Sequence, residues 1–317
     1  MPALTNRIRE TARNFLKQGE VGLVIGFAKG SMPLRSTPWF AREEAEIERL
    51  TWNSFCENNL AQYLVKRPER VAVVAKGCDG RAIVELIKES QIIREQVVII
   101  GIPCEGMIDR RLLEAELGGR EILEIEEHDG RCVIKAADFD ESFDRNAFLY
   151  PSCKVCAHKS PILYDVLLGD AAREIETDSY QDVEEFEAQS SDERWEYLSR
   201  EFSKCIRCYA CRNACPLCYC QECFVDSSWP QWIGKTTEKS DTAIFHLMRV
   251  FHLAGRCVEC GACERACPMG VDIRKLNRKM ARDVKELFGY HAGMSLEQVT
   301  PLATFNQNDP EEFVLDP

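Results

Sequence analysis

The sequence lacks the features that would carry a chain into or across a membrane. No stretch stays apolar for about twenty residues, the length that a membrane-spanning helix needs. The start of the chain, MPALTNRIRETARNFLKQGE, has neither the apolar core nor the small-residue cleavage site of a signal peptide. We therefore expect a globular protein of the cytoplasm.

Positive charge is also in short supply. The chain has 40 Lys and Arg residues against 52 Asp and Glu residues, a net charge of -12, and this argues against a nucleic-acid partner. The sequence contains no GxGxxG, nucleophile elbow, phosphate loop or HExxH pattern. Nothing in it indicates a place where an organic substrate is transformed.

Cysteine, in contrast, is abundant, with seventeen in 317 residues. The reducing cytosol keeps thiols free, so cysteines in short repeats are expected to bind metal and not to form disulfides. With 45% apolar residues, the chain is long enough for two domains, one of which has a substantial core.

The first half alternates strand and helix patterns. The continuous β-branched runs at 21–28, 70–77 and 96–103 are typical of parallel strands buried on both faces. Helical patterns lie beside them, at 5–19, 53–67 and 81–90. Residues 120–138 predict a hairpin that turns at Asp129–Gly130. These patterns predict an α/β domain with a mostly parallel sheet over residues 1–170.

The second half has a different organisation. Residues 171–200 are acidic and predict a solvated connector that ends in a helix capped by Ser191 or Asp192. Residues 201–292 carry most of the cysteines, together with helical patterns at 241–255 and 271–289. Residues 293–317 have no clear period and predict an irregular tail.

Two cysteine runs carry the strongest signal. Cys205-x2-Cys208-x2-Cys211-x3-Cys215-Pro216 recurs as Cys257-x2-Cys260-x2-Cys263-x3-Cys267-Pro268. This is the spacing of two-cluster bacterial ferredoxins, in which the fourth cysteine of each run ligates the other cluster. The predicted ligand sets are Cys205, Cys208, Cys211 and Cys267 for one [4Fe-4S] cluster, and Cys257, Cys260, Cys263 and Cys215 for the other. A zinc site is the alternative, but apolar residues between the cysteines suit a dry cluster shell better.

The distance between the runs decides the kind of ferredoxin. Forty-two positions separate Cys215 from Cys257, and they include a helical stretch, which is too much for a compact strand-built ferredoxin. The segment FHLAGRCVECGACERACPMGVDIRKLNRK resembles the α-helical ferredoxin domains of succinate dehydrogenase iron–sulfur subunits and of the small subunit of heterodisulfide reductase. The resemblance covers about ninety residues and implies an α-helical domain that conducts electrons through a cluster pair.

Four cysteines of the α/β half are expected near one edge of the sheet. Cys78 and Cys104 follow two strands that one helix joins, so both emerge at the carboxyl edge, where open α/β sheets bind ligands. Cys153-x2-Cys156 is predicted in a loop before another helix. Each could simply be a buried small hydrophobe. Glycines beside Cys78 and Cys104, which would let the backbone approach a bulky cluster, favour a ligand role: Gly77, Gly80, Gly101 and Gly106.

This half resembles the β subunits of deazaflavin-reducing hydrogenases and related formate dehydrogenases. The resemblance rests on VAVVAKGCDGRA, VVIIGIPCEGM and CKVCAHKSPILYDVLLGD, and spans about residues 20 to 170. It implies a third cluster, held by Cys78, Cys104, Cys153 and Cys156, and a family that carries FAD. The chain lacks the family's usual amino-terminal ferredoxin run and its long carboxyl-terminal extension. Three charged residues at the same edge could contact a flavin, or be ordinary loop charges: Lys29, Lys76 and Asp79.

Five cysteines remain after these assignments. Cys218, Cys220 and Cys223 form a C-x-C-x2-C triplet that lacks one ligand, and we predict that Cys56 completes a possible fourth cluster with it. Zinc held by the triplet, or inert thiols, are the alternatives. Cys132 is expected to be an ordinary strand residue.

The function that these patterns favour is electron transfer. The chain is predicted to pass electrons through three or four [4Fe-4S] clusters between another redox partner and a catalytic subunit of an anaerobe's complex. From the resemblances, that subunit is a formate dehydrogenase, a hydrogenase or a heterodisulfide-reductase-like protein. The alternatives are an FAD-containing subunit that exchanges hydride with a deazaflavin or nicotinamide, and a zinc-stabilised interaction module.

Overall fold

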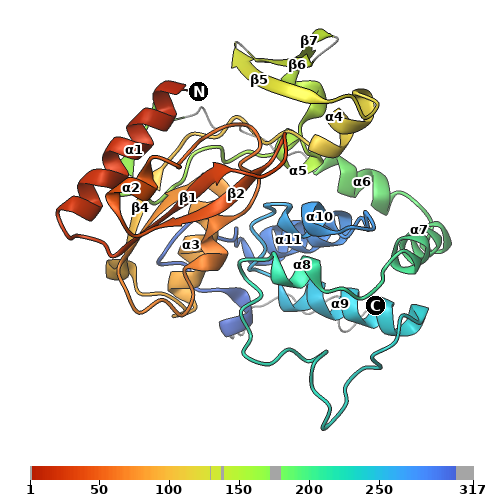
Figure 1. Ribbon diagram of the computed structural model, residues 1–317. Helices are drawn as coiled ribbons and strands as arrows, with labels where there is room; N and C mark the ends of the chain where they lie inside the picture. The colour runs from red at the N-terminus through yellow and green to blue at the C-terminus, as the bar shows by residue number, and fades with distance from the viewer. Residues whose placement is uncertain (1, 129, 137–138, 172–179, 305–317) are drawn as a thin grey trace. The chain divides into compact units, whose positions relative to one another are not determined.

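The computed structural model describes residues 2–128, 130–136, 139–171 and 180–304, and the chain forms two compact units (Figure 1). The first unit comprises Met1–Gly80 and Ser90–Asp178, and the second comprises Arg81–Glu89 and Ser179–Pro317. The predicted combination of an α/β fold with a carboxyl-terminal helical region is confirmed. The second unit also includes a short piece of the α/β half, Arg81–Glu89, which the sequence did not indicate.

A five-stranded sheet forms the centre of the first unit. Its strands lie in the order β2-β1-β3-β4-β8. Their bounds are Ser36–Ala41 for β2, Leu23–Lys29 for β1, Val71–Ala75 for β3, Val97–Gly101 for β4 and Val166–Leu167 for β8. β1, β3, β4 and β8 are parallel, and β3 and β4 are buried along their whole length. The three predicted strands are confirmed, and the antiparallel edge strand β2 was missed.

The helices of the first unit agree only in part with the sequence patterns. Predicted helices correspond to α1 (Pro2–Lys17) and α3 (Gly77–Lys88), of which α3 continues into the second unit. Shorter elements follow in the chain: α2 (Glu44–Ile47), η2 (Arg94–Gln96), α4 (Arg110–Glu116), η3 (Arg145–Phe148) and α5 (Pro151–Lys154). No further helix follows α5 before β8 among the described residues, so the prediction of a helix after Cys156 was wrong.

The predicted helix over 53–67 was also wrong, because only the single turn η1 (Leu60–Tyr63) forms there. Asn53 and Asn59 accept hydrogen bonds from backbone N–H groups two residues further on. Such local side-chain bonds compete with helix formation. The carbonyl groups of Cys56 and Asn58 accept hydrogen bonds from the Lys76 ammonium and are not used within a helix.

A separate three-stranded antiparallel sheet contains the predicted hairpin. It consists of β5 (Ile122–His128), β6 (Arg131–Ala136) and β7 (Asp140–Asp144). Gly130 has a φ of +75°, as a tight turn requires, whereas Asp129 lies outside the described residues. Cys132 on β6 is buried in an apolar cluster with Phe55 and Ile134, as an ordinary strand residue would be.

The second unit is helical. Its helices are α6 (Gln181–Glu187), α7 (Ser191–Ser203), α8 (Ala210–Asn213), α9 (Lys239–His252), α10 (Ala262–Ala266), α11 (Arg274–Phe288) and η4 (Pro301–Ala303). The two long helical predictions are confirmed as α9 and α11. α7 is capped by Ser190, whose side chain accepts a hydrogen bond from Glu193 N, and not by Ser191 or Asp192 as predicted.

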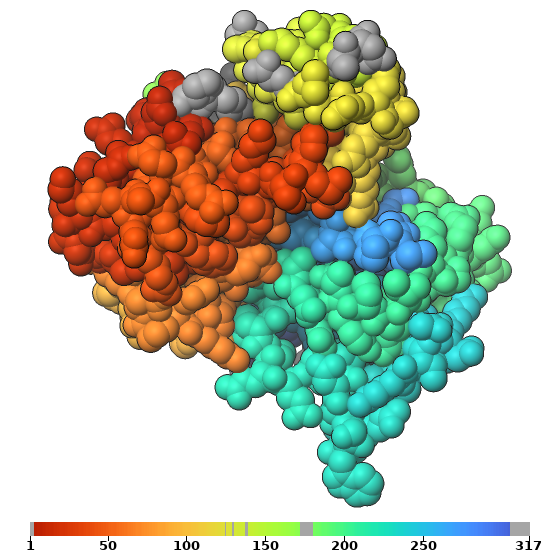
Figure 2. All heavy atoms as spheres, viewed as in Figure 1, coloured from red at the N-terminus to blue at the C-terminus, as the bar shows by residue number. Residues whose placement is uncertain are grey.

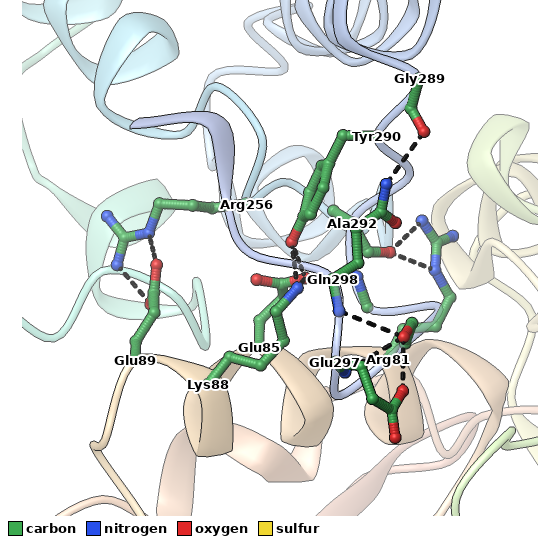
Figure 3. Close-up of polar contacts among 12 residues, drawn as sticks. Arg81, Glu85, Lys88, Glu89, Arg256, Gly289, Tyr290, Ala292, Glu297 and Gln298 are labelled. Atoms are coloured by element: carbon green, nitrogen blue, oxygen red, sulfur yellow. Dashed lines mark hydrogen bonds and ion pairs between the residues drawn. The ribbon is translucent and has the colours of Figure 1, made fainter. Parts of the chain in front are cut away.

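Hydrogen bonds from α3 explain why Arg81–Glu89 belongs to the second unit (Figure 3). Arg81 donates from Nε and Nη2 to the Ala292 carbonyl, at 3.0 and 2.8 Å. Glu85 is fully buried and accepts hydrogen bonds from Tyr290 Oη, at 2.6 Å, and from Gly293 N. Charge-assisted bonds of this kind, when buried, are among the strongest that side chains make.

The long connection between α8 and α9 is the most exposed part of the second unit. It carries Trp229 and Trp232, which are 94% and 68% exposed, and Figure 2 shows this segment (teal) projecting from the unit. Among the residues that the structure describes, no helix has the length and apolar character needed to cross a membrane.

Candidate functional site

The two cysteine runs of the second unit fold in the same way. Arg207 and Tyr209 in the first run, and Glu259 and Gly261 in the second, occupy the same positions relative to the cysteines and all have positive φ, between 56° and 69°. Tyr209 and Gly261 each precede a short helix, α8 and α10. Three of the four are not glycine, and such residues rarely adopt this conformation, so the shared shape is a specific feature of both runs.

The first ferredoxin pocket, as we name it, is lined by the four cysteines that the crossed scheme assigns to one cluster: Cys205, Cys208, Cys211 and Cys267. It encloses about 390 Å³ of empty space, part of it open to solvent. Ile206, Met269, Val271 and Ile273 supply apolar walls. Cys208 is exposed, so this pocket reaches the surface of the unit.

The second ferredoxin pocket is lined by the other four cysteines: Cys215, Cys257, Cys260 and Cys263. Its empty space is about 460 Å³, again partly open. Cys263 lines both pockets, so it lies where they adjoin. In both pockets the fourth cysteine of one run lies with the first three of the other, which is the arrangement that crossed ligation requires.

The donor chemistry of these pockets fits iron–sulfur clusters. Burial raises the pKa of Cys211 and of Cys263 to about 11. Such thiols keep their protons at neutral pH unless a metal takes the sulfur as a thiolate ligand. Among the described residues, no group of three or more His, Cys, Asp or Glu side chains converges on a single metal ion. The thiols instead line the walls of two adjoining pockets, an arrangement that suits polyatomic clusters.

Sequence reasoning missed two residues beside these pockets, both on α9. His246 lines the first pocket and Arg249 lines the second. They are three positions apart, so one face of the helix presents both. A histidine and an arginine on the otherwise apolar face of the 241–255 pattern were the signal that could have identified them.

The cysteines of the α/β half gather beside the carboxyl ends of β3 and β4. Cys78 lies in the first turn of α3, Cys104 follows β4, and Cys153 lies in α5. Burial, reinforced by the neighbouring Cys153 thiol, raises the pKa of Cys104 to about 12, and Cys156 contributes in the same direction. The thiols of Cys78 and Cys104 both interact with the buried ammonium of Lys76. The four thiols thus share one neighbourhood, and their role as ligands stays a prediction.

Glycines allow this neighbourhood to form, though through contacts that the sequence did not reveal. A Cβ at Gly77 would lie 2.0 Å from the His158 carbonyl oxygen, and one at Gly80 would lie 2.7 Å from Pro161. Gly106 has a φ of +100°, and its Cβ would lie 3.2 Å from that of Cys153. Gly77 and Gly80 admit the segment that follows Cys156, and Gly106 admits Leu149 and Cys153, so close protein packing accounts for all three.

Two of the three candidate flavin contacts, Lys76 and Asp79, are paired with each other. The Lys76 ammonium lies 3.0 Å from Asp79 Oδ2, and both side chains are buried. Asp79 also accepts hydrogen bonds from the backbone N–H groups of Leu60 and Lys76. Lys29 is exposed at the end of β1. The Lys76–Asp79 pair therefore connects the η1 segment to the start of α3.

The cysteine triplet is spread over different surroundings. The Cys218 thiol hydrogen-bonds with Cys215, Cys220 is exposed, and Cys223 packs beside Phe245. Cys56 is fully buried in the first unit, where burial raises its pKa to about 11. The fourth cluster, formed by Cys56 with the triplet, stays a prediction.

A larger hollow lies within the first unit. It has about 1530 Å³ of empty space, including open solvent, and charges of both signs surround it. Its lining includes Arg7, Trp52, Glu105, Arg131 and Arg145. Arg145 is already bonded to Ser54 Oγ and to the carbonyl groups of Glu105 and Gly106.

Comparisons with known proteins agree with this division of the chain. Residues 68–195 match the family described as the C terminus of the coenzyme F420 hydrogenase/dehydrogenase beta subunit, and residues 201–271 match the 4Fe-4S dicluster domain. The second match favours clusters over zinc for the cysteine runs. Both resemblances drawn from the α/β half and the cysteine runs are thereby supported, and the prediction of an iron–sulfur electron-transfer protein is confirmed.

Relatives match over most of the chain. An F420-dependent formate dehydrogenase subunit beta of Methanocaldococcus jannaschii is 24% identical over 333 residues, which cover 86% of this chain and 87% of the relative. The F420-dependent formate dehydrogenase 1 subunit beta of Methanococcus maripaludis is 24% identical over 346 residues, which cover 89% of each. A chain of the F420-reducing [NiFe] hydrogenase complex from Methanosarcina barkeri aligns over 50% of this chain and 59% of its own, with a TM-score of 0.39 and 15% identity.

Proposed function

We propose that this chain is a three-cluster electron-transfer subunit, because residues 68–195 match the C-terminal family of coenzyme F420 hydrogenase/dehydrogenase beta subunits and residues 201–271 match the 4Fe-4S dicluster domain. Two [4Fe-4S] clusters occupy the ferredoxin pockets. A third is held by Cys78, Cys104, Cys153 and Cys156. Electrons pass between a catalytic redox subunit and another redox partner through these clusters.

One observation carries the proposal: each ferredoxin pocket combines three cysteines of one run with the last cysteine of the other. A local four-cysteine site would not require Cys267 beside Cys205 or Cys215 beside Cys257. The apolar walls also support it, because dry surroundings are among the factors that set cluster potentials.

The chemistry of the clusters, when bound, is the uptake and release of single electrons. The chain's own residues hold the clusters as thiolates and keep water away from them. Exposed Cys208 makes the first ferredoxin pocket the natural point of exchange with a partner. The relatives' names make a formate dehydrogenase the first candidate for that partner. We place the complex in the cytoplasm, whose reducing conditions keep free thiols available.

Iron and acid-labile sulfide analysis of the anaerobically purified chain tests the cluster number. About twelve irons per chain are expected for three [4Fe-4S] clusters. About sixteen would instead support the fourth cluster of Cys56, Cys218, Cys220 and Cys223. About eight irons would show that only the two ferredoxin clusters are present, without the sheet-edge cluster. Stoichiometric zinc in place of iron would overturn the proposal.

A second candidate function is hydride exchange through FAD with a deazaflavin or nicotinamide. The hollow of the first unit favours it, because its empty space of about 1530 Å³ lies beside Glu105, next to the Cys104 ligand candidate. Arg7 and Arg131 at its rim could contact phosphate groups. Acid release followed by a visible spectrum decides this: one flavin per chain would establish it, and no flavin after purification in the presence of FAD would exclude it.

A further inference from the structure

Arg249 is a buried cation without a carboxylate partner. Its side chain on α9 is 3% exposed, and Nη2 donates to the Cys211 carbonyl at 3.1 Å. Nε and Nη1 are enclosed and have no hydrogen-bond partner. In the part of the chain that the structure describes, no carboxylate lies within ion-pair distance of this guanidinium. A buried charge is costly unless an opposite charge or hydrogen bonds compensate it, so Arg249 requires an anion.

The groups around the guanidinium are cysteine thiols, which become anionic when a metal binds them. The sulfur atoms of Cys263, Cys215, Cys218 and Cys211 lie near enough to interact with the Arg249 charge. Cys263 and Cys215 line the second ferredoxin pocket together with Arg249. A cluster in that pocket would bring a net negative charge to the two unpartnered nitrogens, and this charge grows by one unit on reduction.

The other arginines of the second pocket are already neutralised. Arg278 is paired with Asp182 at 3.1 Å and with Glu259 at 2.9 Å, and Arg274 is paired with Asp182 at 2.8 Å. Carboxylates therefore compensate the positive charges of these two arginines in both oxidation states of a cluster. Among the arginines that line this pocket, only Arg249 has no carboxylate partner and can compensate the charge of a cluster.

The first ferredoxin pocket has a histidine, His246, in the corresponding place. His246 is 2% exposed, stacks on Phe202 with a centroid distance of 5.3 Å, and has no hydrogen-bond partner at either ring nitrogen. Arg207 also has no hydrogen-bond partner at Nε and Nη1, but it is not among the described residues that line this pocket.

We propose that Arg249 is the counter-charge of the cluster in the second ferredoxin pocket and makes it the member of the pair that is reduced first. The inference rests on the proposed function, since it assumes that both pockets hold clusters. Reduction takes one electron from the donor, which is oxidised by one unit, and Arg249 neither gains nor loses a proton. A fixed positive charge stabilises the more negative, reduced cluster and raises its potential. Arg249 thus acts on the cluster through its fixed positive charge and is not a ligand.

The test is a redox titration of the full chain followed by electron paramagnetic resonance. Cys257→Ser first identifies the signal of the second pocket. In Arg249→Met, the equilibrium constant for reduction of that cluster should fall at least tenfold, which is about 59 mV for a one-electron couple. The other ferredoxin signal should move less. Arg249→Lys, which keeps the charge, should restore most of the potential.

Arg282→Met is the matched control, because Arg282 on α11 has the same charge but pairs with Glu187 and Glu286. It should leave both potentials unchanged. Equal shifts of both signals in Arg249→Met, or shifts no larger than in Arg282→Met, would overturn the proposal. If Arg249→Met loses the cluster, Arg249→Lys decides: a wild-type potential supports the counter-charge, and a reduction equilibrium constant lowered tenfold or more refutes it. Absence of both signals from the wild-type chain would instead refute the proposed function.

Discussion

Crossed ligation makes a sharp prediction about two cysteines of the same run. Cys260 and Cys267 are seven positions apart, yet Cys260 lines only the second ferredoxin pocket and Cys267 only the first. Replacing either with serine removes one of four thiolate ligands from one cluster. Each variant should therefore lose at most about four irons per chain, and the two losses should come from different clusters.

Paired variants give this prediction its magnitude and its control. Cys267→Ser with Cys208→Ser changes two ligands of the same pocket, so the double variant should lose about four irons. Cys267→Ser with Cys260→Ser changes both pockets and should lose about eight. Iron analysis and electron paramagnetic resonance of the reduced protein measure both. A local scheme, in which each run holds its own cluster, predicts the opposite pairing, and that result would refute the crossed arrangement.

Three further predictions concern other parts of the chain. Glu85→Gln should destabilise the contact of α3 with Tyr290 by about 3 kcal/mol, because it leaves the buried Lys88 ammonium without its carboxylate; hydrogen exchange in α3 and residues 289–298 should rise, and unchanged exchange would contradict it. Cys104→Ser should remove one paramagnetic signal and spare the ferredoxin pair, whereas Cys220→Ser, at an exposed cysteine, should spare all; survival of every signal in Cys104→Ser would remove the sheet-edge cluster. Burial raises the pKa of Cys132 to about 12, so its thiol should resist alkylation at pH 8 and lose this protection only as the pH rises through that value; rapid labelling of Cys132 at pH 8, measured by mass spectrometry, would show that it is not buried as described.

The core strands could be predicted from sequence because their environment is uniform. β1, β3 and β4 are buried on both faces, and a continuous β-branched run is the direct consequence. β2 was not predicted because its sequence, STPWFA, contains Pro38 and begins with Ser36, and both residue types are typical of turns. As an edge strand it can accommodate a proline, which donates no ladder hydrogen bond.

The segment over 53–67 shows where local pattern fails. Its apolar spacing favours a helix, but the Lys76 ammonium, from beyond the next strand, takes the carbonyl groups of Cys56 and Asn58. That ammonium is buried and must be compensated, and the nearby carbonyl groups together with Asp79 provide this. A contact between distant residues thus overrides the local helix preference, and the apolar periodicity of the segment does not reveal such a contact.

For the same reason, the cysteine ligands could be predicted from sequence, whereas the charged residues around them could not. Ligand spacing is a local property, so the runs at 205–215 and 257–267 could be assigned from sequence. The charge around a cluster depends on which arginines keep a carboxylate partner after folding. Arg274 and Arg278 find Asp182, whereas Arg249 finds only sulfur and a carbonyl group. Cysteine spacing therefore indicates where clusters can bind, and in our proposal the unpaired Arg249 decides which of the two ferredoxin clusters is reduced first.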